Sequence, residues 1–283
     1  MNLIIMNKIG FCYGVDRSIS ITKNTKKLYP KPWILLGPLV HNDIVNNELI
    51  DEGFIMLDNL DLIKNYQNVT FISTAHGISP KTKLEIEQNN NILIETTCPI
   101  VLNNNRKIIK YYNDGFDIVY IGKHNHQESN AILDYIHLVE NTCDIIKLNI
   151  TNPKIVLTNQ TTMSVTDIKK CEQKILEKYP HTIIDTIICP ATKERQVELL
   201  NNLKKFHSPL DKWLIIGDKL SNNTRKLMEL AMEYGLNYNF VQNVDDIKTV
   251  DFSNIVNLLI TSGTSTPNKV IDEIIEYIKE NIQ

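Results

Sequence analysis

The sequence has no uninterrupted apolar segment near the roughly 20 residues that a membrane helix needs, and its first residues lack a signal-peptide pattern. It also lacks an excess of basic charge, because 30 Lys and Arg stand against 33 Asp and Glu, a formal net charge of -3. The five cysteines are odd in number and widely scattered, which does not indicate a secreted disulfide framework. We therefore expect a cytoplasmic protein, or one in an organelle stroma or matrix after loss of a transit peptide, with neither membrane nor nucleic acid as partner.

Long linkers and low-complexity tracts are also missing, and what fills the chain is an alternation of short apolar runs with longer amphipathic stretches. This alternation is typical of α/β proteins with parallel sheets. The predicted strands cover residues 33–36, 69–73, 118–121, 155–158, 213–216 and 256–261. The predicted helices that follow them cover residues 43–52, 81–88, 128–135, 165–179, 224–234 and 269–282.

Motif residues recur along the chain at a nearly constant interval. Three pairs lie 85 or 86 residues apart, namely Cys12 and Cys98, His41 and His126, and His76 and Thr161. A looser third copy follows at 91, 95 and 104 residues, as Cys189, Ser221 and Ser265. These offsets predict a threefold internal repeat in which each copy is a small α/β lobe.

The predicted fold is therefore α/β, with three similar lobes that each contain a small, mostly parallel sheet, in a pseudo-threefold arrangement. The expected boundaries are residues 1–13 for the first strand and first cysteine, 14–98 for lobe one, 99–189 for lobe two and 190–283 for lobe three. Ligands bind at the carboxyl ends of parallel strands, so we expect the loops there to face a shared centre.

Three of the cysteines occupy corners between a strand and a helix. Cys98 and Cys189 each precede a proline that suits a first helical turn, where the helix dipole favours thiolate, and Cys12 lies in GFCYGV after the first strand. Three thiols without a local Cys-x-x-Cys pair argue against structural zinc. They suit an iron-sulfur cluster with one iron open to substrate, although the short ferredoxin spacings are absent. Taken singly, each could also be a buried structural thiol, and we interpret Cys143 and Cys171 as core or surface thiols.

Residues 121–128 (IGKHNHQE) carry two histidines and a carboxylate just beyond a predicted strand. Alone, the segment could equally be an exposed loop or a helix start. Equivalent loops elsewhere contain further polar residues, namely His41, His76, Thr161, Thr162, Ser221, Asn222, Asn223 and Ser265. Imidazoles, hydroxyls and amides gathered in this way suit a diphosphate held mainly by neutral or titratable donors.

The motifs GFCxGV, VHN, AHG, TCP, HxE, QTTxS, ICxATxxRQ and STP occur in that order between about residues 3 and 275. The set resembles the hydroxymethylbutenyl diphosphate reductases, which complete the methylerythritol phosphate route to isoprenoids. The resemblance implies three lobes around a central [4Fe-4S] cluster bound by Cys12, Cys98 and Cys189, whose open iron receives the substrate hydroxyl. It also implies isopentenyl and dimethylallyl diphosphates as products, and ferredoxin or flavodoxin as electron donor.

By the same resemblance, Glu128 supplies protons, Thr161 orients the hydroxyl and relays them, and His126 belongs to both the catalytic and the binding set. The implied diphosphate contacts are His41, His76, His126, Ser221, Asn223 and Ser265, with Thr162 and Asn222 close by. The chain departs from the family pattern where Gln127 replaces the usual Pro and Asn222 the usual Ser. An amide can still donate to phosphate.

Three alternatives stay open at the level of sequence. A divergent member of this family could bind diphosphates or sense redox state through its cluster without turnover. A zinc or cysteine hydrolase could use Cys98 as nucleophile beside a histidine. A scaffold protein could use the same thiols only to fill its cores.

Overall fold

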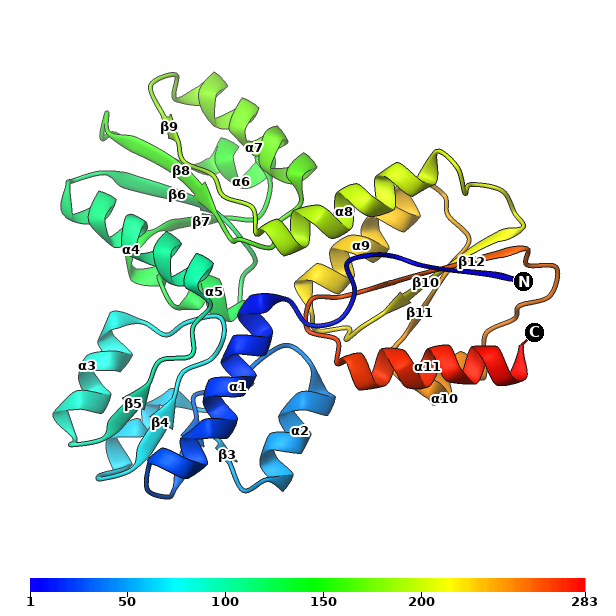
Figure 1. Cartoon of the computed structure of the whole chain (residues 1–283). Coiled ribbons are helices and arrows are strands. Elements are labelled where there is room, and N and C mark those ends of the chain that lie inside the picture. The colour runs from blue at the N-terminus through cyan, green and yellow to red at the C-terminus, as the bar shows by residue number, and fades with distance from the viewer. Residues whose placement is uncertain (283) are drawn as a thin grey trace. The chain divides into compact units, whose positions relative to one another are not determined.

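A computed structural model describes residues 1–282, and within them three four-stranded sheets form, each with all strands parallel (Figure 1). This confirms the predicted α/β class with three small parallel sheets. The first sheet has the order β3-β2-β4-β5. Its strands are β2 (Trp33–Leu35), β3 (Ile55–Met56), β4 (Thr70–Ile72) and β5 (Ile92–Ile94).

The second sheet repeats this topology as β7-β6-β8-β9. Its strands are β6 (Asp117–Ile121), β7 (His137–Val139), β8 (Ile155–Asn159) and β9 (Ile183–Ile184). The third sheet has the order β11-β10-β12-β1. Its strands are β1 (Asn2–Ile5), β10 (Asp211–Ile216), β11 (Tyr238–Val241) and β12 (Asn257–Ser262).

The N-terminal strand completes the third copy of the repeat. β1 pairs with β12 in parallel, with Asn2 opposite Asn257 and Ile5 opposite Ile260, so it takes the outer place that β5 and β9 take in the other sheets. Figure 1 shows this dark blue strand beside the orange and yellow strands from the end of the chain. The start and the end of the sequence therefore build one sheet, and the predicted lobe boundaries stay a prediction.

The helices follow the strands in a repeating order. After each outer strand comes a long helix: α4 (Pro99–Asn113), α8 (Pro190–Leu203) and α1 (Tyr13–Leu28). The inner strands are followed by α2 (Asp43–Asp51), α5 (Gln127–Asn130), α9 (Asn222–Glu233), α3 (Pro80–Gln88), α7 (Val165–Lys178) and α11 (Asn268–Asn281). Shorter turns of helix are η1 (Leu60–Asn65), α6 (Thr142–Lys147), α10 (Val244–Ile247) and η2 (Leu133–Tyr135).

Local sequence explains where these helices begin. In α7 the Ser164 hydroxyl accepts the Asp167 N–H, and Ile168, Cys171 and Ile175 recur at helical spacing on the buried side. The short helices of the three lobes share a capping residue, because the side chains of Asn59, Asn141 and Asn243 accept the N–H two residues on. This recurrence extends the repeat beyond the motifs that the sequence spacing revealed.

One predicted helix is broken. The stretch 128–135 forms the short α5 and the 3-10 turn η2, separated at Ala131 and Ile132. Ile132 leaves the helical conformation, with φ -130° and ψ 13°, and its side chain packs in the core beside Ile118 and Tyr120. Burial of this side chain, worth roughly 1.5–3 kcal/mol, outweighs the continuation of an exposed helix.

The sheets carry apolar side chains on both faces, as expected for parallel strands covered by helices. All six residues of β10 are buried, with Leu214 packing against α11 and Trp213 in the cluster on the other face. By packing, the chain divides into two compact units: Met1–Val15, His41–Val45 and Pro190–Gln283 form one, and Asp16–Val40 and Asn46–Cys189 form the other. Among residues 1–282, the helices are too short or too polar to cross a bilayer.

Candidate active site

Each of the three motif cysteines directly precedes a long helix and is partly exposed. Cys98 is the N-cap of α4, Cys189 precedes Pro190 of α8, and Cys12 precedes Tyr13 of α1. Their backbone N–H groups donate to the carbonyls of a strand-end loop in the same relative place, at 3.0, 2.8 and 3.0 Å, namely Ala75, Thr161 and Thr264 for Cys98, Cys189 and Cys12. The three corners thus share one backbone geometry.

This shared hydrogen bond corrects one detail of the repeat. It makes Ala75, Thr161 and Thr264 equivalent, so His76 corresponds to Thr162 and to Ser265. The 85-residue spacing from His76 to Thr161 therefore misaligned this loop by one residue. The interval at this loop is 86 residues, the same as between Cys12 and Cys98.

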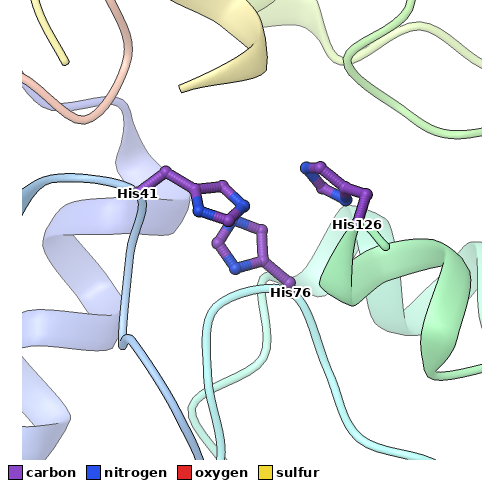
Figure 2. A group of neighbouring side chains, drawn as sticks. All are labelled: His41, His76 and His126. Atoms are coloured by element: carbon purple, nitrogen blue, oxygen red, sulfur yellow. The ribbon is translucent and has the colours of Figure 1, made fainter. Parts of the chain in front are cut away.

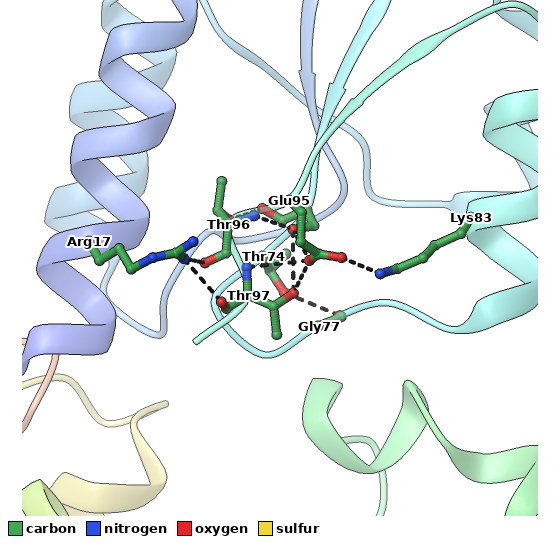
Figure 3. Close-up of polar contacts among 8 residues, drawn as sticks. Arg17, Thr74, Gly77, Lys83, Glu95, Thr96 and Thr97 are labelled. Carbon is green, nitrogen blue, oxygen red and sulfur yellow. Dashed lines mark hydrogen bonds and ion pairs between the residues drawn. The ribbon is translucent and has the colours of Figure 1, made fainter. Parts of the chain in front are cut away.

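The loop before Cys98 is held by a half-buried ionic network (Figure 3). The Glu95 carboxylate accepts hydrogen bonds from the hydroxyls of Ser73, at 2.9 Å, and Thr97, and it pairs with the Lys83 ammonium. Burial by itself would raise the pKa of Glu95, but these donors more than compensate and hold the pKa below its usual value. Glu95 is therefore a fixed anion at the base of the loop.

The backbone of the same loop is tied down from a second direction. The Arg17 guanidinium donates to the carbonyls of Thr96 and Thr97 at 3.4 and 3.2 Å, and Figure 3 shows it approaching from α1, opposite Lys83. The Thr96 N–H donates to the Ser73 hydroxyl at 2.8 Å. Because its preceding residues have these partners, the position of Cys98 is set before any ligand binds.

Glu128 is an acid buried at the start of α5, with only 1% of its surface exposed. Its carboxylate accepts the Thr161 N–H at 2.7 Å, the Thr161 hydroxyl at 3.2 Å and the Tyr120 hydroxyl at 3.4 Å. Burial raises the pKa of Glu128 to about 7, although the three hydrogen bonds oppose the shift. This carboxyl can therefore both hold and release a proton near neutral pH.

Two histidines lie edge to face beside this acid. The ring centroids of His76 and His126 are 5.4 Å apart with an interplanar angle of 82°, and Figure 2 shows the two rings extending from neighbouring loops. His126 Nδ1 accepts the backbone N–H of Glu128 at 3.1 Å and so caps α5. His76 Nδ1 lies 2.7 Å from the side-chain oxygen of Gln127.

The other compact unit carries a polar loop cluster of its own. The Ser265 hydroxyl donates to the His41 carbonyl at 2.9 Å, and the Thr264 N–H donates to Asn223 Oδ1 at 3.0 Å. Ser221 caps α9, whose first residues Asn222 and Asn223 are buried. Within residues 1–282, Asn223 Nδ2 is buried and has no hydrogen-bond partner. The predicted Thr162, in the unit that contains Asn46–Cys189, receives a hydrogen bond from Gln160 at 2.8 Å.

The LytB protein family model matches residues 3–279 of this chain. The chain belongs to the LytB family. Proteins named 4-hydroxy-3-methylbut-2-enyl diphosphate reductase from Bacillus pumilus and Macrococcus caseolyticus are 35% and 33% identical to it, over 99% of this chain and 91% and 89% of theirs. Family membership makes the chain an oxidoreductase of isoprenoid biosynthesis, as predicted.

Solved structures agree with this assignment. A solved structure of the E-1-hydroxy-2-methyl-but-2-enyl-4-diphosphate reductase from Plasmodium falciparum superimposes with a TM-score of 0.88 at 30% identity, covering 99% of this chain and 89% of that one. A structure of (E)-4-hydroxy-3-methyl-but-2-enyl diphosphate reductase gives a TM-score of 0.71 at 25% identity, covering 99% and 100%. The LytB fold therefore extends over nearly the whole chain.

Sequence reasoning missed the basic residues that hold the cysteine loops of this LytB chain. Arg17 of α1 binds the loop before Cys98, Lys107 of α4 pairs with Asp185 at 2.9 Å ahead of Cys189, and buried Arg195 of α8 donates to the Gly10 carbonyl at 2.6 Å ahead of Cys12. Each helix that follows one cysteine thus holds the loop of another. The signal was a basic residue five to nine positions after each cysteine.

Proposed function

We propose that this chain reduces 4-hydroxy-3-methylbut-2-enyl diphosphate, the compound in the names of its relatives, to isopentenyl and dimethylallyl diphosphates. The C–O bond to the allylic hydroxyl breaks with uptake of two electrons and two protons. One proton leaves with the oxygen as water, and the other is added to carbon. The electrons come from an external donor of the ferredoxin or flavodoxin class.

The proposal includes a [4Fe-4S] cluster on Cys12, Cys98 and Cys189. The donor set fits, because each thiol precedes the first turn of a helix, where the dipole favours thiolate, and a three-cysteine cluster keeps one iron open. The other two cysteines are less suited to bind the cluster. Burial and nearby carboxylates raise the pKa of the Cys171 thiol to about 11, and Cys143 is exposed on α6. When bound, the cluster would pass the two electrons of the external donor to the substrate, one at a time, and supply a Lewis-acidic iron for the hydroxyl.

The observation that carries the proposal is the buried acid Glu128 held by Thr161. Burial raises the pKa of this carboxyl to about 7, so it can keep a proton near neutral pH. The Thr161 hydroxyl, 3.2 Å from Glu128 Oε2, provides a path by which this proton can reach a departing oxygen. We therefore assign proton donation to Glu128, and to Thr161 the relay of that proton and the orientation of the substrate hydroxyl. We place His126 with them in the catalytic set.

The diphosphate would be bound by two loop sets. One comprises His76, His126 and Thr162, and the other His41, Ser221, Asn222, Asn223 and Ser265. One support is the buried Asn223 Nδ2, a hydrogen-bond donor that could bind an anion. Another is the N-terminus of α9, capped by Ser221, because the helix dipole there favours negative charge. His126 adds a third donor, since its Nδ1 is an acceptor and Nε2 therefore carries the proton in the neutral ring.

Anaerobic purification with iron and sulfide analysis, followed by a reductant-driven assay, tests the proposal. We expect about four irons per chain and electron consumption only when the allylic diphosphate is present. A cluster without substrate-dependent electron consumption would leave the diphosphate-binding or redox-sensing alternative. A protein that stays colourless after reconstitution would rule out the cluster.

A further inference from the structure

Gln127 lies between His126 and Glu128, where the family usually has Pro, and its side chain crosses to two other loops. Its Oε1 is 2.7 Å from His76 Nδ1. Its Nε2 lies over Gly37, where an added Cβ would be only 3.0 Å away. Gly37 has φ +96°, a conformation that favours glycine, and the missing side chain leaves room for the amide. Gln127 thus joins the α5 loop to the loops that end β2 and β4.

The contact with Gln127 decides where the proton lies on His76. An amide oxygen only accepts hydrogen bonds, so His76 Nδ1 must carry the proton of this pair. His126 has the opposite arrangement, because its Nδ1 accepts the Glu128 N–H and its neutral ring is protonated at Nε2. Two rings with centroids 5.4 Å apart are therefore held as opposite tautomers by two different partners.

We propose that Gln127 is a positioning residue for diphosphate binding, which holds the His76 ring through Nδ1 and directs Nε2 toward the anion. The identity of the anion rests on the proposed function. When the ring carries both protons, Nε2–H donates to a phosphate oxygen while Gln127 keeps its bond to Nδ1. Proline has no side-chain acceptor and could not do this. This chain therefore orients His76 with a side-chain hydrogen bond that the usual proline cannot make.

The surroundings of Gln127 allow a clean substitution. The side chain is half-buried and lines a cavity of about 270 Å³ together with Gly37, Thr74 and Asn130. Gln127→Met keeps the length of the side chain and removes the acceptor, and the cavity gives the thioether room to relax. Gln127→Glu restores an acceptor for the Nδ1 proton. Gln173→Met makes the same chemical change on the exposed face of α7 and is the matched control.

The first measurement is the tautomer of His76 in the full-length chain without ligand, by two-bond proton–nitrogen NMR of nitrogen-15-labelled histidine. The His76 signals are assigned by their loss in His76→Asn. We expect a proton at Nδ1 in the unsubstituted chain, in Gln127→Glu and in Gln173→Met, and a shift toward the Nε2–H form in Gln127→Met. A tautomer that is unchanged in Gln127→Met, or an Nε2–H form in the unsubstituted chain, would overturn the proposal.

The second measurement is calorimetric binding of inorganic diphosphate to the same proteins. We expect Gln127→Met to bind about tenfold more weakly, because it removes the acceptor that holds the Nδ1 proton of the doubly protonated His76 ring while Nε2–H donates to the anion, and Gln173→Met to bind normally. Equal affinity in Gln127→Met and the unsubstituted chain would overturn the role in binding. Absence of reductase turnover alongside both expected results would reject the proposed function and leave the positioning role standing.

Discussion

Glu128 and Thr161 are joined by two hydrogen bonds, one from the Thr161 N–H at 2.7 Å and one from its hydroxyl at 3.2 Å. Thr161 also accepts the N–H of Cys189 through its carbonyl, at 2.8 Å. One residue of the β8 loop therefore contacts both the proposed proton donor and the backbone of a proposed cluster ligand. The backbone of Thr161 therefore fixes the position of the Glu128 carboxylate relative to the backbone of Cys189.

Glu128→Gln should abolish turnover without disturbing the site. The amide has the same shape as the acid but carries no proton that it can give up. We expect kcat to fall by about 10²–10⁴-fold, the usual loss for a general acid. Iron content and affinity for the substrate should stay within about twofold of the unsubstituted enzyme. Near-normal turnover would exclude Glu128 as proton donor.

The stability of the fold should reflect the raised pKa of Glu128. In the folded state the pKa of Glu128 is about 7, against 4.5 for the solvated side chain, so the folded protein binds more protons between these values. Stability is therefore lost as the pH rises from about 4.5 to about 7, by about 3 kcal/mol from this group. Urea unfolding at several pH values in this range should show that the free energy of unfolding falls as the pH rises. Glu128→Gln should remove the part of this fall that comes from Glu128. An identical pH dependence in the two proteins would contradict the assigned pKa.

Thr161 offers a test of the proton relay. Thr161→Val keeps the backbone N–H to Glu128 and the shape of the side chain but removes the hydroxyl, whereas Thr161→Ser keeps the hydroxyl. We expect kcat to fall by about tenfold or more in the valine variant and to recover in the serine variant. Solvent deuterium isotope effects on kcat should differ between the two. Equal rates would assign Thr161 a purely structural role.

The network behind Cys98 should control how firmly the cluster is retained. Glu95→Ala leaves Lys83, Ser73 and Thr97 without their shared acceptor, at a cost of about 2 kcal/mol. We expect iron to be lost to a chelator several times faster than from the unsubstituted protein. Glu177→Ala, which removes an exposed partner of Lys174 on α7, is the matched control and should lose iron at the normal rate. Equal rates for both variants would show that the loop needs no such support.

Sequence patterns were sufficient for the two inner strands of each sheet, the three cysteine corners and the repeat, because these depend on local periodicity and on residues at regular spacing. They were not sufficient for the pairing of β1 with β12, which joins residues some 255 positions apart and has no local signal. The same limit applies to Gln127 and His76, 51 residues apart, and to Tyr120, which appeared to be an ordinary strand residue beside Glu128. Contacts of this kind depend on how loops meet in three dimensions.

Asn223 has one side-chain atom with a structural contact and another that we propose binds the diphosphate. Its Oδ1 accepts the Thr264 N–H, while its buried Nδ2 has no partner in the part of the chain that the structure describes. Asn223→Asp keeps the acceptor for Thr264 but replaces the donor with a negative charge, so we expect inorganic diphosphate to bind at least tenfold more weakly by calorimetry. Asn222→Ser, which introduces the usual family residue next door, should bind within about threefold of the unsubstituted chain, because a hydroxyl also donates to phosphate. Unchanged affinity in Asn223→Asp, with normal melting, would remove Asn223 from the diphosphate site and leave it as a support for the β12 loop.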